Sequence, residues 1–382
     1  MSLRFPAQAA SHDELLDSSH ESMVQEQCSA ILVPTNRPVK SLSFCIGLAR
    51  ETHIPLIVVC SKRVTKDEVK AAASGEDMTV YAVDLPMHPA APPEGISFLT
   101  STDEELLAVS SGRTRDLSTK RNLGLLMAKM LGWQRLIFLD DDIYGISKAE
   151  VDALAAGLNS HNVSVLIPDE FPDNSVACHA YRLGGGQQGK FAGAGAMGVR
   201  CDRNDLPFFP NIYNDDWFFF ADEAAGRRIN QVGAARQKQY DPFADPERAV
   251  MEEFGDLLAE GLYWRLGQGL DILSVDTAFW EEFIQGRRVF LEGVADSLAR
   301  RSERGLDSDT GRNVRAAHVS ISAAQRQLKR IKPELCQRFI DLWIADLVEW
   351  RTHVSRLPLA DSIASALEYL GLRYAMAKPG IR

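Results

Sequence analysis

The sequence predicts an α/β fold in which a mainly parallel sheet is flanked by helices and followed by an all-helical C-terminal region. Strand-like and helix-like segments alternate between residues 29 and 245, which is typical of a parallel sheet covered by helices. From about Pro246 onward, long helical periods replace the strand signals. The 382 residues also exceed the usual length of one domain. We therefore divide the chain into an N-terminal arm (1–28), an α/β domain (29–245) and a helical region (246–382).

The first half of the predicted sheet follows the arm directly. Residues 1–28 are polar and carry no strand signal, so we expect a mobile arm or a surface helix. The next segments alternate in type: a strand at Ala30–Val33, a helix at Lys40–Glu51, a strand at Pro55–Cys60, a helix at Lys66–Ala73 and a strand at Thr79–Val83. The proline-rich stretch Met87–Gly95 can continue neither type of element, so it ends this half.

The second half begins with a helix for which Ser118 is the expected N-cap. Its apolar side chains recur at helical spacing and predict one buried face: Leu123, Leu126, Met127, Met130 and Leu131. A continuous apolar run over Leu136–Leu139 then predicts a strand that is buried on both faces. A helix at Lys148–Leu158 and a strand at Val163–Ile167 follow.

The composition narrows the class of protein. Hydrophobic residues make up 45% and charged residues 25%, as in ordinary folded soluble chains. The net charge of −10 argues against a nucleic-acid partner, which would require a basic surface. The six scattered cysteines show neither zinc-finger nor redox spacing. No apolar leader and no run of roughly 18 apolar residues is present, so we expect a cytoplasmic protein without a transmembrane segment.

Three consecutive aspartates, Asp140, Asp141 and Asp142, end the buried strand. They should lie at the carboxyl edge of the sheet, where α/β proteins bind ligands. Adjacent carboxylates repel one another unless a cation neutralises them, and Mg²⁺ or Mn²⁺ prefers such oxygen ligands together with substrate phosphates. The alternative is a solvated acidic turn in which Asp142 caps the next helix.

Four basic residues stand close together just before this strand: Arg113, Arg115, Lys120 and Arg121. They lie near the first turn of the predicted helix, and both the cations and a helix N-terminus favour anions. We interpret them as a clamp for phosphate and nucleotide. The alternative is a solvated basic turn.

Together these segments resemble glycosyltransferases of the GT-A fold, a Rossmann-like α/β architecture, and in particular their large inverting family 2. VPTNRP (33–38) is similar to the first strand and nucleotide-binding turn of that family. STKRNLGLLMAKMLGWQRLIFLDDDI (118–143) is similar to its helix with an RN pair and its DxD motif. The resemblance covers about residues 31–225. It implies a hexosyltransferase, dependent on Mn²⁺ or Mg²⁺, that moves a sugar from a nucleotide-diphosphate sugar donor to an unidentified acceptor hydroxyl.

The resemblance also implies roles for individual residues. Asp140 would contact the ribose of the donor, and Asp142, with Asp140, would hold the metal. Ile143 replaces an acidic residue that the family often has, so which two of the three aspartates act stays open. The remaining donor-binding residues would be Pro34, Thr35, Arg37, Arg113, Lys120, Arg121, Asn122, Asp141, Gly193 and Gly195.

The acceptor side is expected farther along the chain. GGGQQGKFAGAGAMGVR (184–200) resembles the glycine-rich segment under the donor sugar, and NDDWFFFAD (214–222) takes the place of the acceptor-side acidic motif. Asp216, or else Asp215, would be the catalytic base, and Trp217 would offer a face for a sugar. The alternative is that these two acids cap a helix.

The helical region lacks clustered acids and phosphate-binding turns, so we do not expect it to carry the donor site. Phe339, Trp343, Leu347 and Trp350 recur at helical spacing, which predicts buried tryptophans. We expect this region to build acceptor-side contacts or the contacts of a homo-oligomer.

Two other functions remain open from the sequence. A haloacid-dehalogenase-like phosphatase also uses a strand that ends in DxD, although that motif normally opens its domain and here about 135 residues precede it. A non-catalytic scaffold that binds sugar nucleotides could retain the same sheet. Sugar-phosphate nucleotidyltransferases are less compatible, because the glycine-rich opening that they need is absent from VPTNRPVK.

Overall fold

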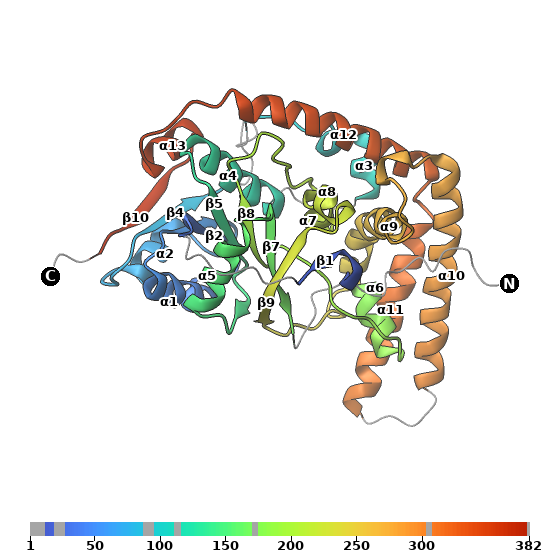
Figure 1. Cartoon of the computed structure of the whole chain (residues 1–382). Helices are drawn as coiled ribbons and strands as arrows, with labels where there is room; N and C mark the ends of the chain where they lie inside the picture. The colour runs from blue at the N-terminus through green and yellow to red at the C-terminus, as the bar shows by residue number, and fades with distance from the viewer. Residues whose placement is uncertain are drawn as a thin grey trace.

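The computed structural model describes residues 12–18, 27–86, 95–110, 116–169, 175–302 and 308–379. Figure 1 shows an α/β arrangement with a mixed, mostly parallel sheet and a helical C-terminal region. The strands are β1 (Leu16–Asp17), β2 (Ala30–Thr35), β3 (Leu56–Cys60), β4 (Val80–Asp84), β5 (Arg135–Leu139), β6 (Ile143–Tyr144), β7 (Val163–Pro168), β8 (Ala196–Arg200), β9 (Ile229–Gln237) and β10 (Tyr374–Ala377).

The order of the strands across the sheet is β1-β9-β7-β8-β5-β2-β3-β4-β10, and β6 pairs with β9 away from this path. The pairs β2–β3, β3–β4, β2–β5, β7–β9 and β1–β9 are parallel. Strand β8 runs antiparallel to both of its neighbours, β5 and β7. The chain thus builds outward from β2 to β4 and then returns to β5 on the other side of β2.

Helices cover both faces of this sheet because successive side chains of a buried strand point to opposite faces. Along β2, Leu32 belongs to the core that α4 covers, whereas Ile31 and Val33 belong to the core of α1 and α5. The helices of this half are α1 (Ser43–Thr52), α2 (Lys66–Ala73), α3 (Glu104–Val109), α4 (Asp116–Met130), α5 (Lys148–Gly157), α6 (Val176–Leu183), α7 (Asp215–Phe219) and α8 (Ala221–Ala225).

Local chemistry explains where several of these helices begin. Thr65 and Ser147 form capping boxes with Glu68 and Glu150, so α2 and α5 start as the sequence predicts. The expectation for Ser118 was wrong: α4 already begins at Asp116, and Ser118 is buried within it.

Gly124 in the middle of α4 reflects how closely this helix approaches the sheet. A Cβ atom at this position would lie 2.5 Å from Leu32 Cδ1 and 3.3 Å from Leu136 Cδ2. A larger residue would therefore displace the buried Leu32 side chain or move α4 away from β2. This contact matters for the site, because α4 carries Lys120 and Arg121 beside the ends of both strands.

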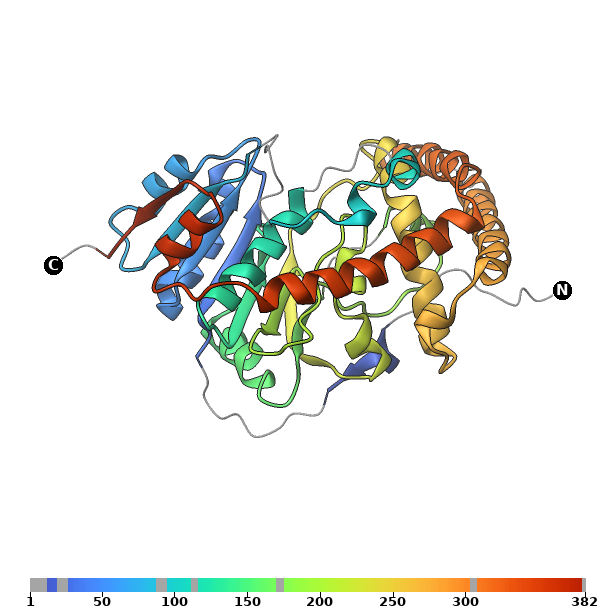
Figure 2. The same ribbon diagram turned by 90° about the horizontal axis from the view of Figure 1, so that it is seen from above.

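The C-terminal helices are α9 (Glu247–Gly267), α10 (Thr277–Ser302), α11 (Ser308–Leu328), α12 (Pro333–Ser355) and α13 (Ile363–Tyr369). Figure 2 shows α12 as one long helix that spans the molecule between α10 and α13. Trp280, Trp343 and Trp350 are buried as predicted, and Trp264 is partly buried. Their side chains belong to the same hydrophobic core as Leu32 of the sheet, so residues 246–382 share a core with the α/β part.

The two terminal segments differ from expectation. The C-terminal region is not all-helical, because β10 pairs antiparallel with β4 at one edge of the sheet. Within the predicted N-terminal arm, β1 pairs with β9 at the other edge, and Asp17 lies 3.0 Å from His161 Nε2. The rest of that arm, residues 1–11 and 19–26, lies outside the described residues. Two short strands from opposite ends of the chain therefore cover the two sheet edges.

None of the helices that the structure describes is both long enough and apolar enough to pass through a membrane.

Candidate functional site

A cavity of about 510 Å³ opens where β2 and β5 end side by side. Here the order of the strands reverses, and the crevice outside such a switch point is the usual binding place in open α/β sheets. Its walls are formed by Pro34, Thr35, Asn36 and Arg37 after β2, by Lys62 after β3, by Asp116, Leu117 and Lys120 of α4, by Asp140, Asp141 and Asp142 after β5, and by Tyr213, Arg248, Met251 and Glu252.

Arg37 bridges Asp141 and Asp142, and its positive charge offsets the repulsion between their carboxylates. Its Nη1 donates to Asp141 Oδ1 at 2.8 Å and its Nη2 to Asp142 Oδ2 at 3.0 Å. Thr35 Oγ1 donates to the other oxygen of Asp141 at 2.5 Å. Burial raises the pKa of Asp141, and these two donors oppose that rise. The predicted contacts Thr35 and Arg37 thus line the cavity, with Asp141 held between them.

Arg121 has a different place from the one expected. Its Nη2 lies 3.2 Å from Asp140 and its Nη1 lies 3.1 Å from Asp215, while its guanidinium stacks over the Phe209 ring. Burial lowers the pKa of Arg121, but the attraction of the two carboxylates outweighs it and holds the pKa above the ordinary value. Only 3% of this side chain is exposed, so Arg121 bridges two acidic groups and does not present itself to a ligand.

Lys120 lines the cavity but is already fully engaged. Its ammonium group lies 2.8 Å from the Thr35 carbonyl oxygen, 2.7 Å from Ser61 Oγ and 2.6 Å from Asp116 Oδ1. A lysine has three N–H donors, and these contacts use all of them. Burial lowers its pKa, and Asp116 opposes this. Lys120 therefore fastens α4 to the ends of β2 and β3.

Asn122, a predicted nucleotide contact, has a structural role. Its side chain donates to the Phe209 carbonyl at 3.0 Å and accepts from the Phe209 N–H at 2.9 Å. It is buried and is not among the described residues that line the cavity. Arg113, the other predicted contact on this segment, lies outside the described residues.

The glycine-rich segment connects the aspartate cluster to the predicted base. The backbone N–H of Asp140 donates to the Gly195 carbonyl at 2.8 Å, and the N–H of Ala194 donates to Asp216 Oδ2 at 2.9 Å. A Cβ on Gly193 would lie 3.3 Å from that same oxygen. The segment thus passes between Asp140 and Asp216, and its glycine at 193 permits the close approach.

Asp215 and Asp216 form the first turn of α7. Burial, followed by repulsion from Asp215, raises the pKa of Asp216 to about 6, and Arg121 opposes this rise. Neither aspartate is among the described residues that line the cavity. Asp215 is connected to it through Arg121, which also contacts Asp140, and Asp216 is the next residue along the chain.

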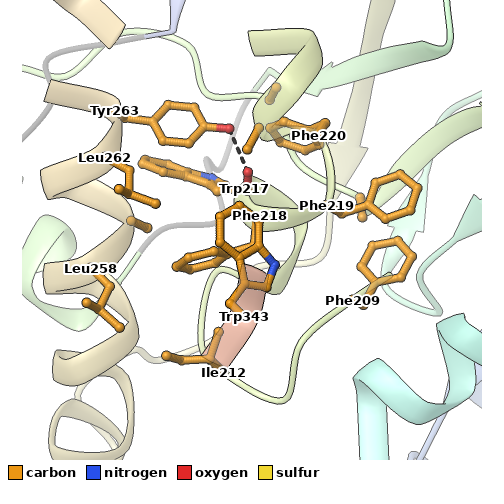
Figure 3. Close-up of a cluster of buried hydrophobic side chains, with 14 of the residues drawn as sticks. Phe209, Ile212, Trp217, Phe218, Phe219, Phe220, Leu258, Leu262, Tyr263 and Trp343 are labelled. Atoms are coloured by element: carbon orange, nitrogen blue, oxygen red, sulfur yellow. Dashed lines mark hydrogen bonds between the residues drawn. The ribbon is translucent and has the colours of Figure 1, made fainter. Parts of the chain in front are cut away.

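Trp217 cannot offer the predicted face for a sugar, because only 5% of it is exposed. Figure 3 shows it within the aromatic cluster beside Tyr263, whose hydroxyl donates to the Trp217 carbonyl at 2.8 Å. The ring centroids of Trp217 and Tyr263 are 4.6 Å apart, and the ring centroid of His12, in the N-terminal segment, lies 4.2 Å from that of Trp217. Trp217 therefore anchors the turn that carries Asp216.

Sequence reasoning missed the wall that α9 contributes. Arg248 Nε donates to Glu252 Oε1 at 2.5 Å, and its Nη2 donates to the Tyr240 hydroxyl at 2.9 Å. Burial raises the pKa of Glu252 to about 7, and Arg248 opposes this. No pattern in the sequence marks these residues as cavity-lining. Lys62, by contrast, follows β3 by two residues at the same sheet edge as the aspartates, and that position could have indicated it.

The residues at the carboxyl end of β5 fit a hard divalent cation. All three offer only carboxylate oxygens, which suit Mg²⁺ or Mn²⁺, and Asp140 is the most exposed of them, with 25% of its side chain accessible. The hydrogen bonds of the Asp142 side chain to described residues both reach Oδ2. Both oxygens of Asp141 accept hydrogen bonds, as do both oxygens of Asp140, which face Arg121 Nη2. Asp140 is the better disposed of these two to take a cation because more of its side chain is exposed, and Asp142 because its Oδ2 alone accepts these bonds.

A second group of potential ligand atoms lies in the interior, where Cys178, Asp256 and Glu260 approach within 4.8 Å of one another. Arg287 Nη2 lies 2.5 Å from Asp256 Oδ2, so the charge of that carboxylate is already neutralised. Burial holds the pKa of the Cys178 thiol far above its usual range, which disfavours the thiolate that a metal would need. We interpret this group as part of a buried ion-pair network.

No protein-family model matches the chain, and no curated protein is significantly similar to it in sequence.

Proposed function

We propose that this protein is a glycosyltransferase of the GT-A type, dependent on Mn²⁺ or Mg²⁺, that transfers a hexose from a nucleotide-diphosphate sugar to an acceptor hydroxyl. The observation that carries the proposal is the position of Asp140, Asp141 and Asp142. They line a cavity of about 510 Å³ at the switch point of the sheet, next to the exposed cations Arg37 and Lys62. An acidic cluster faced by cations suits a metal-bound diphosphate.

In this proposal Asp140 and Asp142 hold the metal, which when bound neutralises the charge on the diphosphate. Thr35 and Arg37 line the nucleotide end of the cavity, beside β2. Arg37 pairs with two of the aspartates, so binding of a cation there weakens its contacts and frees its guanidinium for the donor. Arg121 keeps its positive charge at all working pH values, and from its buried position it holds the Asp140 carboxylate in place.

Asp216 is the proposed base, with inversion as the expected stereochemistry. Its pKa of about 6 is that of a carboxylate able to take a proton near neutral pH. The backbone N–H groups of Ala194 and Trp217 fix its two oxygens. Asp215 is the weaker candidate, because Arg121 pairs with it at 3.1 Å.

The test is thermal denaturation with UDP, GDP, ADP, CDP or dTDP, each with and without Mn²⁺, and with Mg²⁺ alone. A transferase should be stabilised only when nucleotide and metal are present together, because each completes the site of the other. Stabilisation by Mg²⁺ alone would favour the phosphatase, and no response to any combination would favour the scaffold. Either result would contradict the proposal.

A further inference from the structure

The cavity has a second wall that comes from outside the motif-bearing half of the chain. Tyr213, Arg248, Met251 and Glu252 form it, and the last three lie within the first two turns of α9. This wall adds a cation to a site whose other basic residues belong to the β2, β3 and α4 side.

The cations of the cavity differ in how much hydrogen-bonding capacity remains. All three donors of Lys120 are used, whereas Arg37 uses two of its five N–H donors, one on each Nη, and both of these reach aspartates. Lys62 lies 3.3 Å from Asp116. Arg248 uses Nε and Nη2, and the part of the chain that the structure describes offers no hydrogen-bond partner to its Nη1. With 31% of its side chain exposed, Arg248 can receive an anion.

Its surroundings hold the guanidinium group ready for such a ligand. The group stacks over the Tyr240 ring at 4.4 Å, and Glu252 and the Tyr240 hydroxyl fix two of its nitrogens. Glu252 is itself fixed by the backbone N–H of Val176 at 2.7 Å. The first turn of a 21-residue helix also favours negative charge. An arginine that is already ordered loses little entropy when it binds a phosphate.

We propose that Arg248 binds the β-phosphate of the donor and stabilises it as the leaving group. This inference rests on the proposed glycosyltransferase function. In the transfer, the bond between the anomeric carbon and the β-phosphate oxygen breaks, and its electron pair stays on the phosphate. The acceptor oxygen forms the new bond to that carbon, and the acceptor proton goes to the base. The charge that develops on the β-phosphate is what Arg248 offsets.

The experiment compares Arg248→Gln with wild type by calorimetry in the presence of Mn²⁺, using the best-bound of the five nucleoside diphosphates and its monophosphate. A hydrogen bond to a charged group typically changes affinity by roughly tenfold to a hundredfold, which is the expected loss for the diphosphate. The monophosphate lacks the β-phosphate, so its affinity should stay within about twofold, well below the effect of one such bond.

Two further variants separate this effect from damage to the fold. Arg265→Gln is the matched control, because Arg265 lies on the same helix, makes two hydrogen bonds of its own and is not among the described cavity residues. The double variant Arg248→Gln with Glu252→Gln removes the cation without leaving a buried carboxylate unpaired, and it should show the same loss as Arg248→Gln. Unchanged diphosphate affinity, or an equal loss for the monophosphate, would overturn the role of Arg248 alone. If the wild-type protein bound no nucleoside diphosphate in the presence of Mn²⁺, that result would contradict both the role of Arg248 and the proposed glycosyltransferase function.

Discussion

Replacing Arg121 with glutamine should destabilise the protein more than any loss of a surface ion pair. The substitution leaves Asp215, a buried carboxylate, without its cation, and it removes the ion pair between Arg121 and Asp140. Breaking a buried ion pair costs about 3–5 kcal/mol. An entropy of unfolding of about 2.1 cal/mol/K per residue gives about 0.8 kcal/mol/K for this chain, so the melting temperature should fall by about 4–6 °C.

The assay is thermal denaturation at pH 7.5, with Arg50→Gln as the control. Arg50 pairs with Glu76 at 2.8 Å on the surface, and such exposed pairs contribute about 0–1 kcal/mol, or a shift of about 1 °C at most. A double variant, Arg121→Gln with Asp215→Asn, should recover part of the loss because no buried charge is then left unpaired. If Arg121→Gln melted within about 1 °C of wild type, the bridge between Asp140 and Asp215 would not have the importance that we assign to it.

Three further predictions concern the proposed reaction. Asp142→Ala should abolish the binding of nucleoside diphosphate that depends on Mn²⁺, and calorimetry showing unaltered affinity would exclude Asp142 as a ligand. Asp216→Asn should reduce turnover by about 10²- to 10⁴-fold with donor affinity nearly intact, whereas Asp215→Asn should reduce turnover less. The pKa of Asp216 is about 6 in the folded protein, above the ordinary value of 3.8, so the folded state binds this proton more tightly than the unfolded state does. The stability that this proton contributes is fully present below the unfolded pKa and is lost as pH rises through about 6. Denaturation at a series of pH values should therefore show Asp216→Asn gaining stability relative to wild type as pH rises, and a constant difference would contradict the shift.

The elements that sequence predicted well are those set by local chemistry. The strands before Asp84 and the capped starts of α2 and α5 depend on alternation, apolar runs and the side chains of Thr65 and Ser147. The aspartates were expected at a strand end for the same reason, since the apolar run over Leu136–Leu139 marks the part of the chain that is buried between the two cores of the sheet.

Features that depend on distant segments could not be predicted in this way. The i, i+4 spacing of Arg248 and Glu252 is visible in the sequence, but which side of α9 faces the cavity depends on how that helix packs on the shared core. Trp217 is a second example. An aromatic residue next to an acidic one in the sequence can either line a binding site or be buried in the core behind it. Here Tyr263 and His12, from two remote parts of the chain, bury it.

The strands β1 and β10 bear on how the protein can be shortened. A fragment of residues 29–245, which the alternating pattern suggests as a unit, would lack both of them. It would expose the backbone N–H and C=O groups of β4 over Val80–Val83 and those of β9 at Ile229 and Asn230. Such edges pair readily with other chains, so this fragment should aggregate even though it contains every predicted donor-binding residue. The smallest well-behaved fragment should extend from His12 to Ala377, because only that span brings its own covers for both edges.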